Sequence, residues 1–351
     1  MSVRSRLLPI AAASIAVTTG LHGAGQQPAK APAAGIERLR GQIERVTASA
    51  QGIVGVSIKH LESGASLAVN GDEPFPMAST FKLPVLVALY AKAKDGTLKW
   101  DDMVDISATD LHLGSGDLTP LFDPPGIRLS MHNVANLMMM ISDNSAADIC
   151  LAKAGAANVN ARMRALGIDG IRVDRPCQEL ILDYLGRDTT TLKGLPRDEL
   201  QLALKTAATP ETEETRFKAD DRVAADPRDN ATPNAFVRLL EKIWRGEAVD
   251  RAASDAMLET LKRCRTGENR LRGLLPPATE VAHKTGTLGG VVNDVGIVYL
   301  PDNAGHVAIA VMSKRTRNVQ AEVERTIANI SRYAYDYFYF TGTETGTASR
   351  R

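Results

Sequence analysis

The stretch that decides how this 351-residue chain is interpreted is Ser79-Thr80-Phe81-Lys82, followed by a mostly apolar run that ends at Lys94. The run is typical of a helix, since Pro84 is tolerated in a first turn and Asp95-Gly96 marks an end. Residues three apart share a helix face, so the Ser79 hydroxyl and the Lys82 ammonium should be neighbours. A serine needs a base to become a nucleophile, and a buried lysine can be that base. Alternatively, Ser79 is a helix cap and Lys82 a surface charge.

Two polar segments further along support the nucleophile interpretation. Ser142-Asp143-Asn144 separates two apolar helical stretches, and alone it would predict a capped turn. Lys284-Thr285-Gly286-Thr287 continues a strand that ends near Gly289-Gly290, and alone it would predict an ordinary edge hairpin. The ordered set of three segments, more than any one of them alone, favours the nucleophile interpretation.

Ser-x-x-Lys, Ser-Asp-Asn and Lys-Thr-Gly in this order resemble the signature of class A serine β-lactamases and penicillin-binding proteins. The resemblance implies that Ser79 forms an acyl-enzyme and that Lys82 activates it. It also implies that Ser142 relays a proton to the leaving nitrogen and that Asn144 hydrogen-bonds a substrate amide.

The same resemblance assigns substrate-binding roles to the strand that carries Lys284. Lys284 would supply positive charge, and Gly286 would let the substrate approach the backbone. The backbone N–H of Thr287 would form an oxyanion hole with that of Ser79, while the hydroxyls of Thr285 and Thr287 would hold the substrate carboxylate.

The deacylation base is the fourth element of the motif set. Class A enzymes that this chain resembles carry a glutamate, three residues before Leu-Asn, that activates the hydrolytic water. Glu179 with Leu182-Asp183 fits that pattern, and we predict it as the base, with Asp183 holding the water. A register fixed on Asp174-Arg175 would instead place Cys177 there and leave no base. Fast turnover that survives Glu179→Gln would make Glu199 the first acid to try.

Two arginines and a long insertion complete the expected site. By resemblance, Arg270 would anchor the substrate carboxylate through its planar guanidinium. Arg175 would pair with Asp229 and close the loop between them. That loop is lengthened by residues 184–225, for which we predict a short helix with polar flanks and a role as a lid.

The composition and net charge argue against several classes of partner and cofactor. A net charge of +1 gives no reason to expect nucleic acid or an anionic membrane as a partner. The six histidines are scattered, with no His-x-x-x-His and no Cys-x-x-Cys, so no metal or other cofactor is predicted. Cys150, Cys177 and Cys264 permit at most one disulfide, and the sequence does not choose it. The expected partner is a small β-lactam molecule, and the protein is expected to act as a monomer.

The predicted organisation begins with a cleavable export signal at residues 1–25 and a linker at 26–35, which implies a periplasmic or secreted protein without a membrane anchor. The catalytic domain spans 36–340, and residues 341–351 form a disordered tail. The fold class is α/β: an antiparallel sheet flanked by N- and C-terminal helices, with an all-helical lobe inserted over about 79–275.

These patterns predict hydrolysis of the β-lactam amide through a serine acyl-enzyme. Two alternatives share the three motifs: a D,D-peptidase or related penicillin-binding protein, and a sensor that stays acylated.

Overall fold

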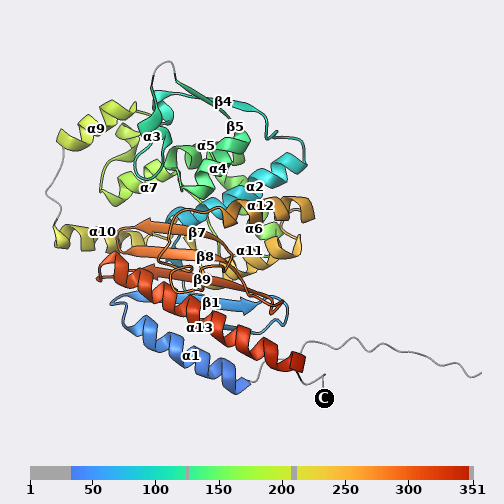
Figure 1. The fold of residues 1–351 in the computed structure, drawn as a ribbon. Coiled ribbons are helices and arrows are strands. Elements are labelled where there is room, and N and C mark those ends of the chain that lie inside the picture. The colour runs from blue at the N-terminus through green and yellow to red at the C-terminus, as the bar shows by residue number, and fades with distance from the viewer. Residues whose placement is uncertain (1–32, 124–125, 207–211, 348–351) are drawn as a thin grey trace, which may run out of the picture.

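A five-stranded antiparallel sheet forms the centre of the fold (Figure 1). The computed structural model describes residues 33–123, 126–206 and 212–347. The strand order is β2-β1-β9-β8-β7, with the bounds β1 Ile53–His60, β2 Ser66–Val69, β7 Val281–Leu288, β8 Val291–Tyr299 and β9 His306–Lys314. This arrangement confirms the predicted fold class.

Strand β9 shows why the sheet is covered on both faces. Successive side chains of a strand point to opposite faces, so a strand with apolar residues at every position must be buried on both. One face of β9 packs into a core with α1 (Ala33–Ala48) and α13 (Gln320–Thr347), through Val307, Ile309 and Val311. The other face enters the core shared with the helical lobe, through Ala308, Ala310 and Met312.

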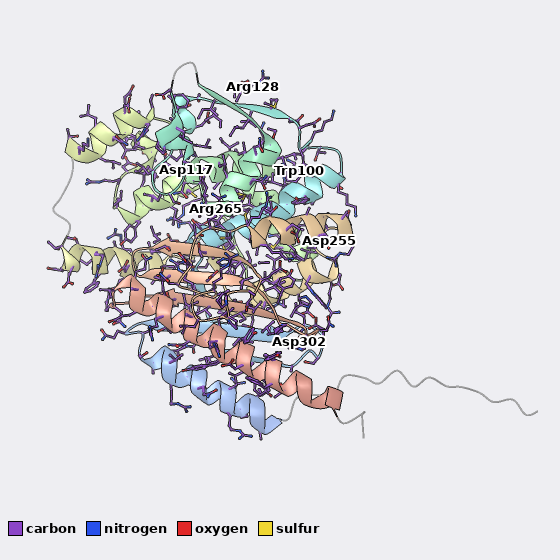
Figure 2. All side chains as sticks on the ribbon, in the orientation of Figure 1. Trp100, Asp117, Arg128, Asp255, Arg265 and Asp302 are labelled. Atoms are coloured by element: carbon purple, nitrogen blue, oxygen red, sulfur yellow. The ribbon has the colours of Figure 1, made fainter. Side chains whose placement is uncertain are left out.

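The helical lobe stands on that second face, with Arg128 at its outer end and Asp302 near the opposite end of the molecule (Figure 2). It contains two short 3₁₀ helices, η1 Ala78–Phe81 and η2 Ala108–Asp110. Its α-helices up to the insertion are α2 Lys82–Lys94, α3 Leu118–Leu121, α4 Met131–Met140, α5 Asn144–Ala154, α6 Ala156–Ala165 and α7 Cys177–Tyr184. Two further helices, α11 Pro233–Arg245 and α12 Arg251–Lys262, lie between the lobe and the sheet.

The lobe is not purely helical, which corrects the expectation for residues 79–275. A two-stranded ribbon joins β4 (Met103–Ile106) to β5 (Ile127–Ser130), and β6 (Asn230–Ala231) pairs with β3 (Phe75–Pro76). The β4 and β5 segments combine β-branched residues with charged ones, so their pairing satisfies backbone groups at the surface.

The insertion at 184–225 is largely helical. Its described part contains α8 (Thr189–Leu192), α9 (Arg197–Thr206) and α10 (Glu213–Ala225). Helix α10 docks onto the β7–β8 turn because its buried Asp220 accepts the Gly290 N–H at 2.8 Å. Asp220 also accepts the hydroxyl of Tyr184, the last residue of α7, at 3.1 Å. The predicted short helix is therefore a set of helices, one of which is fixed to the sheet.

Both predicted ends of the catalytic domain need correction. Helix α1 begins at Ala33, inside the predicted linker at 26–35. Helix α13 continues to Thr347, into the segment expected to be a disordered tail at 341–351. The predicted export signal lies outside the described residues. In the described ranges, no helix combines the length and apolar character needed to cross a bilayer.

Candidate active site

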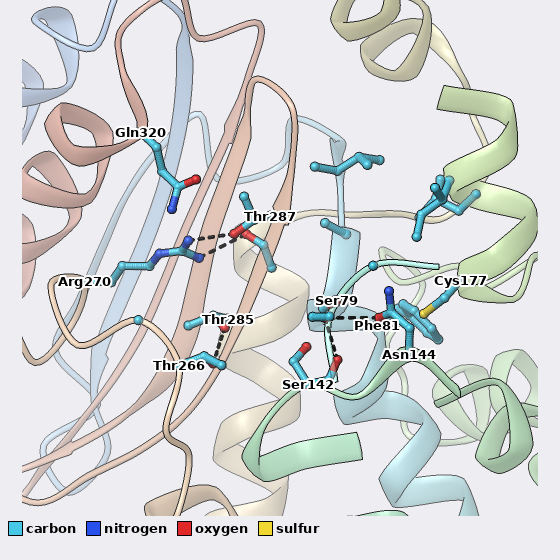
Figure 3. Close-up of a pocket in the computed structure, with 18 of the residues that line it drawn as sticks. Ser79, Phe81, Ser142, Asn144, Cys177, Thr266, Arg270, Thr285, Thr287 and Gln320 are labelled. Carbon is cyan, nitrogen blue, oxygen red and sulfur yellow. Dashed lines mark hydrogen bonds between the residues drawn. The ribbon is translucent and has the colours of Figure 1, made fainter. Parts of the chain in front are cut away.

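A cavity of about 610 Å³ lies where the helical lobe meets strand β7 (Figure 3). Its walls come from η1, β7, α7, α13 and the segment around Ser142 and Asn144. Ser79, Ser142 and Asn144 lie on one side of the cavity and Thr285, Thr287 and Arg270 on the other (Figure 3). The structure thus brings together motif residues that are up to about two hundred positions apart in the sequence.

Ser79 is held at the start of the helical lobe by a constrained turn. Ala78, immediately before it, has a φ of 44°, a left-handed conformation that costs an alanine about 1–2 kcal/mol. The side-chain amide of Asn293 on β8 donates to the carbonyls of Pro76 and Met77 at 2.9 and 3.1 Å, which holds this turn. Ser79 itself is partly exposed to the cavity.

Gly286 is required because β7 passes very close to that turn. A Cβ at this position would lie 2.6 Å from the Met77 carbonyl oxygen and 3.1 Å from the Ser79 backbone nitrogen. Only glycine permits this approach without displacing the strand. This close approach places the Ser79 backbone N–H beside β7. An oxyanion hole formed by the N–H groups of Ser79 and Thr287 requires that position.

Lys82 is fully buried beside the Ser-Asp-Asn segment. Its Nζ donates to the Ser142 carbonyl at 2.6 Å and to the Asn144 side-chain oxygen at 2.8 Å, and it lies 3.2 Å from Ser142 Oγ. Burial lowers the pKa of Lys82 below its ordinary value. A lysine in this setting can exist as a neutral amine, which a general base must be.

The Ser142 hydroxyl lies between two lysines. Its Oγ is 2.9 Å from Lys284 Nζ as well as 3.2 Å from Lys82 Nζ. Burial, followed by repulsion from Lys82, lowers the pKa of Lys284 to about 7. Ser142 has a left-handed φ of 60°, so the backbone is strained to present this hydroxyl.

Arg270 and the threonines of β7 form the opposite wall. The guanidinium of Arg270 donates to Thr287 Oγ1 at 2.6 Å and to the Gly286 carbonyl at 3.1 Å, and it pairs with Glu324 at 3.1 Å. The Thr285 hydroxyl shares a 2.6 Å hydrogen bond with the Thr266 hydroxyl. Arg270 thus reaches the predicted wall, with its donors already engaged there.

Glu179 does not face the cavity, contrary to the prediction. Its carboxylate pairs with Lys193 Nζ at 2.6 Å, while α7 turns Cys177, Leu180 and Ile181 toward the cavity. The cause is helical geometry: a residue two positions after Cys177 lies about 200° around the helix from it. The register in which Cys177 occupies the expected base position is the one that the structure adopts.

The predicted clamp explains this register. Arg175 Nε lies 2.6 Å from Asp229 Oδ2, which confirms their pairing and fixes the loop immediately before α7. Asp183 pairs with Arg175 and with Arg228. This pairing differs from the prediction, in which Asp183 holds a water for Glu179.

Sequence analysis missed the residue that anchors α7 from the other side. Asp148 on α5 accepts the backbone N–H of Cys177 at 2.6 Å and that of Gln178 at 3.0 Å, and it also contacts His112. These are free N–H groups of the first turn of α7, so Asp148 caps the helix from a distant element. No local pattern links positions 29 residues apart.

The remaining predictions concern cysteines, metals and the insertion. All three cysteines are buried free thiols. In the described ranges, no group of three His, Cys, Asp or Glu side chains is arranged so that it could hold a metal ion. The cavity lining of the described structure comes from residues outside 184–225, so the predicted lid does not cover the cavity here.

Comparison with known proteins agrees with this site. The chain matches the β-lactamase enzyme family over residues 38–338 and belongs to that family. The site is therefore that of a serine hydrolase of the class A β-lactamase type.

Individual relatives are distant but span nearly the whole chain. The β-lactamase VEB-1 of Pseudomonas aeruginosa is 25% identical over 86% of this chain and 91% of its own length. The crystal structure of a β-lactamase from Chitinophaga pinensis is 28% identical, covers 85% of this chain and 98% of that one, and superposes with a TM-score of 0.65. A mutant of PBP-A, solved as its acyl-enzyme with penicillin G, is 26% identical. It covers 86% of this chain and 97% of its own chain, with a TM-score of 0.67.

Proposed function

We propose that the protein hydrolyses β-lactams through an acyl-enzyme on Ser79. The single observation that carries this proposal is the buried hydrogen-bond cluster of Lys82, Ser142 and Lys284 at the end of the cavity that holds Ser79. It supplies a base, a proton relay and a cation around one nucleophile. The family membership supports the same reaction.

The proposed acylation step gives each of these groups a role. Lys82, as the neutral amine, takes the Ser79 proton while Ser79 Oγ attacks the lactam carbonyl. The N–H groups of Ser79 and Thr287 stabilise the oxyanion. As the ring C–N bond breaks, Ser142 passes its proton to the leaving nitrogen and receives from Lys82 the proton that Lys82 took from Ser79, which leaves Lys82 neutral again.

Substrate binding belongs to the β7 wall. Lys284, Thr285 and Thr287 would hold the carboxylate of the β-lactam, and Asn144 would hold its side-chain amide. Arg270 orients Thr287 by its 2.6 Å hydrogen bond and adds positive charge near the carboxylate.

Deacylation is assigned here to a group other than Glu179, and the pairing of the Glu179 carboxylate with Lys193 outside the cavity supports this. We propose that Lys82 also activates the hydrolytic water. After acylation its Nζ is again beside the Ser142 hydroxyl, and its depressed pKa allows it to release the proton that it gained.

A second candidate function rests on the apolar character of α7. Cys177, Leu180 and Ile181 present no carboxylate to an acyl-enzyme. Such a wall would suit a D,D-peptidase or a sensor that remains acylated, and the alternatives are distinguished by the lifetime of the adduct.

The test is steady-state hydrolysis of a chromogenic cephalosporin by the purified protein. Many turnovers per enzyme molecule would support the β-lactamase, while one equivalent of product and a persistent mass increase would contradict it. A cell-wall peptide cleavage assay would then separate the peptidase from the sensor.

We also propose that the protein is exported and acts as a monomer. The basic and apolar pattern of the first 25 residues supports export. Fractionation of expressing cells and the mass of the purified protein in solution test the two statements.

A further inference from the structure

One end of the active-site cavity carries a carboxylate that the proposed reaction does not use. Gln320 and Glu324, one turn apart on α13, line the cavity together with Arg270. Arg270 and Gln320 lie beyond Thr287, on the side away from Ser79 (Figure 3). The C-terminal helix thus brings a negative charge to the wall that is proposed to bind the substrate carboxylate.

The Glu324 carboxylate has one oxygen engaged and one open. Its Oε1 accepts from Arg270 Nε at 3.1 Å and from Gln320 Nε2 at 2.9 Å. Within the described residues, Oε2 makes no hydrogen bond and is not sealed from solvent. Because Glu324 lines the cavity and its side chain is 13% exposed, this second oxygen is available to a ligand bound there.

Arg270 offers no free cation at the same place. Its Nη1 donates to the carbonyls of Gly286 and Asn293 at 3.1 and 2.8 Å, and its Nη2 donates to Thr287 Oγ1 at 2.6 Å. Its Nε donates to Glu324, so four of its five N–H groups are engaged. The ion pair is neutral overall, and the group that it leaves for a ligand is an acceptor, the open oxygen of Glu324.

Thr287 relates this carboxylate to the bound substrate. The proposed function, on which this inference rests, places the ring carboxylate of a β-lactam at the hydroxyls of Thr285 and Thr287. Thr287 Oγ1 and Glu324 Oε1 contact the same guanidinium, so Glu324 and the carboxylate site are one side chain apart. In a cephalosporin, the ring carbon next to the one that bears the carboxylate carries the C3 substituent. That substituent therefore extends from the end of the molecule that Glu324 faces.

We propose that Glu324 and Gln320 form a subsite for a cationic substituent beside the ring carboxylate, so that the site favours zwitterionic cephalosporins. Glu324 attracts the cation through its open oxygen. It also neutralises Arg270, whose charge would otherwise repel the cation. Gln320 contributes an amide oxygen to the same end, because its Nε2 is turned toward Glu324.

Removal of the Glu324 charge has two effects of the same sign. E324Q keeps the size of the side chain but leaves the charge of Arg270 unpaired. A cationic substituent then loses an attraction and meets a repulsion. The loss of one charge-assisted contact corresponds to about a tenfold change in kcat/KM.

Cephaloridine and cephalothin are matched probes for this subsite. They share the nucleus, the ring carboxylate and the thienylacetamido side chain, and they differ at C3. Cephaloridine carries a cationic pyridiniomethyl group there, and cephalothin carries a neutral acetoxymethyl group. The readout is the ratio of kcat/KM for cephaloridine to kcat/KM for cephalothin. A general effect of a variant on folding or on carboxylate binding changes both values and cancels in the ratio.

E324Q should lower this ratio about tenfold relative to the wild type. E322Q is the matched control, since Glu322 is an exposed residue of the first turn of the same helix and lies outside the cavity lining. It should leave the ratio within about twofold. Q320K also should lower the ratio, because the exposed Gln320 would be replaced by a cation that occupies the subsite. An unchanged ratio in E324Q or Q320K, or an equal fall in E322Q, would overturn the proposal.

Equilibrium binding separates the subsite from the proposed chemistry. S79A has no hydroxyl to acylate, so calorimetry can measure the Kd of both probes for S79A and for S79A/E324Q. The added E324Q change should raise the Kd of cephaloridine about tenfold more than the Kd of cephalothin. Equal changes in the two Kd values, or no binding of either probe, would overturn the subsite. If the wild type forms no acyl adduct, the proposed function fails, and the two Kd values still decide the subsite. If the wild type hydrolyses both probes with a ratio that E324Q does not change, the subsite alone fails.

Discussion

At the scale of single residues, the site depends on two lysines that share one hydroxyl. Ser142 Oγ accepts from both Lys82 and Lys284 inside a buried pocket. Two ammonium groups so close together repel strongly where the dielectric constant is low, so one of them is readily deprotonated. The proposed chemistry assigns the neutral form to Lys82 and the charge to Lys284.

The pKa of Lys284 predicts a pH dependence. Lys284 is charged below about pH 7 and loses its proton as the pH rises through that value, so kcat/KM should fall above about pH 7. The buried groups that act on it are Lys82 and Arg270, which lower its pKa, and Cys264 and Asp294, which raise it. A pH–rate profile measures this fall, which forms the alkaline limb of the profile. K284R keeps the charge and should move the limb to higher pH; an unmoved limb would assign it to another group.

The same pKa predicts the opposite sign for stability. Between about pH 7 and the ordinary lysine value of about 10.4, the unfolded chain holds a proton on this residue that the folded protein lacks. The contribution of Lys284 to the free energy of unfolding therefore rises with pH across this window.

The position of Glu179 gives a second residue-scale prediction. E179Q should change deacylation by less than about twofold, because the variant loses only a partly exposed ion pair with Lys193, worth about 0–1 kcal/mol. Stopped-flow decay of the acyl-enzyme measures the rate. L180E is the contrasting variant, because it places a carboxylate on the face of α7 that lines the cavity, where Glu179 places none. Arrest of deacylation in E179Q would mean that Glu179 enters the cavity during turnover.

At the scale of elements, α7 is positioned by contacts at its first turn. Asp148 caps it and the Arg175–Asp229 pair holds the preceding loop. D148A should reduce the free energy of unfolding by about 1–3 kcal/mol, since it leaves buried N–H groups unpaired. Denaturant unfolding checks this value. D148N keeps one acceptor oxygen and should lose less stability than D148A. Equal losses of stability in the two variants would show that the capping hydrogen bonds are not the source of the effect.

The sequence predicted elements well where the signal is local. Ser79 and Lys82, three residues apart at a helix start, and Lys284 to Thr287 on one strand are local patterns. The structure places Ser79 and Thr285 to Thr287 at one cavity and holds both buried lysines against Ser142, which also lines it. The register of α7 was mispredicted because it depends on Asp148 and Asp229, which are distant in sequence.

At the scale of the whole molecule, two cores enclose the sheet and the insertion is fastened to one edge. Helix α10 reaches the β7–β8 turn through Asp220, whose carboxylate also faces Arg317 at 3.9 Å. The fastening lies at the end of the strand that carries Lys284, so the insertion and the site share a support.

Loss of this fastening should be visible by limited proteolysis. D220A removes the acceptor for the Gly290 N–H and should accelerate cleavage within residues 184–225, while the sheet and its two cores stay protected. D221A is the control, since Asp221 is half-exposed and pairs only at the surface with Arg315 and Arg317. Equal cleavage rates for the two variants and the wild type would show that Asp220 does not hold the insertion.

The most direct test of the central claim is the intact mass of the protein after brief mixing with a β-lactam and acid quenching. The wild type should gain the mass of one β-lactam, and peptide mapping should place it on the peptide that contains Ser79. S79A should gain nothing under the same conditions while retaining its fold, because the hydroxyl that forms the ester is gone. A covalent adduct on folded S79A, or an adduct of the wild type at another residue, would contradict the account.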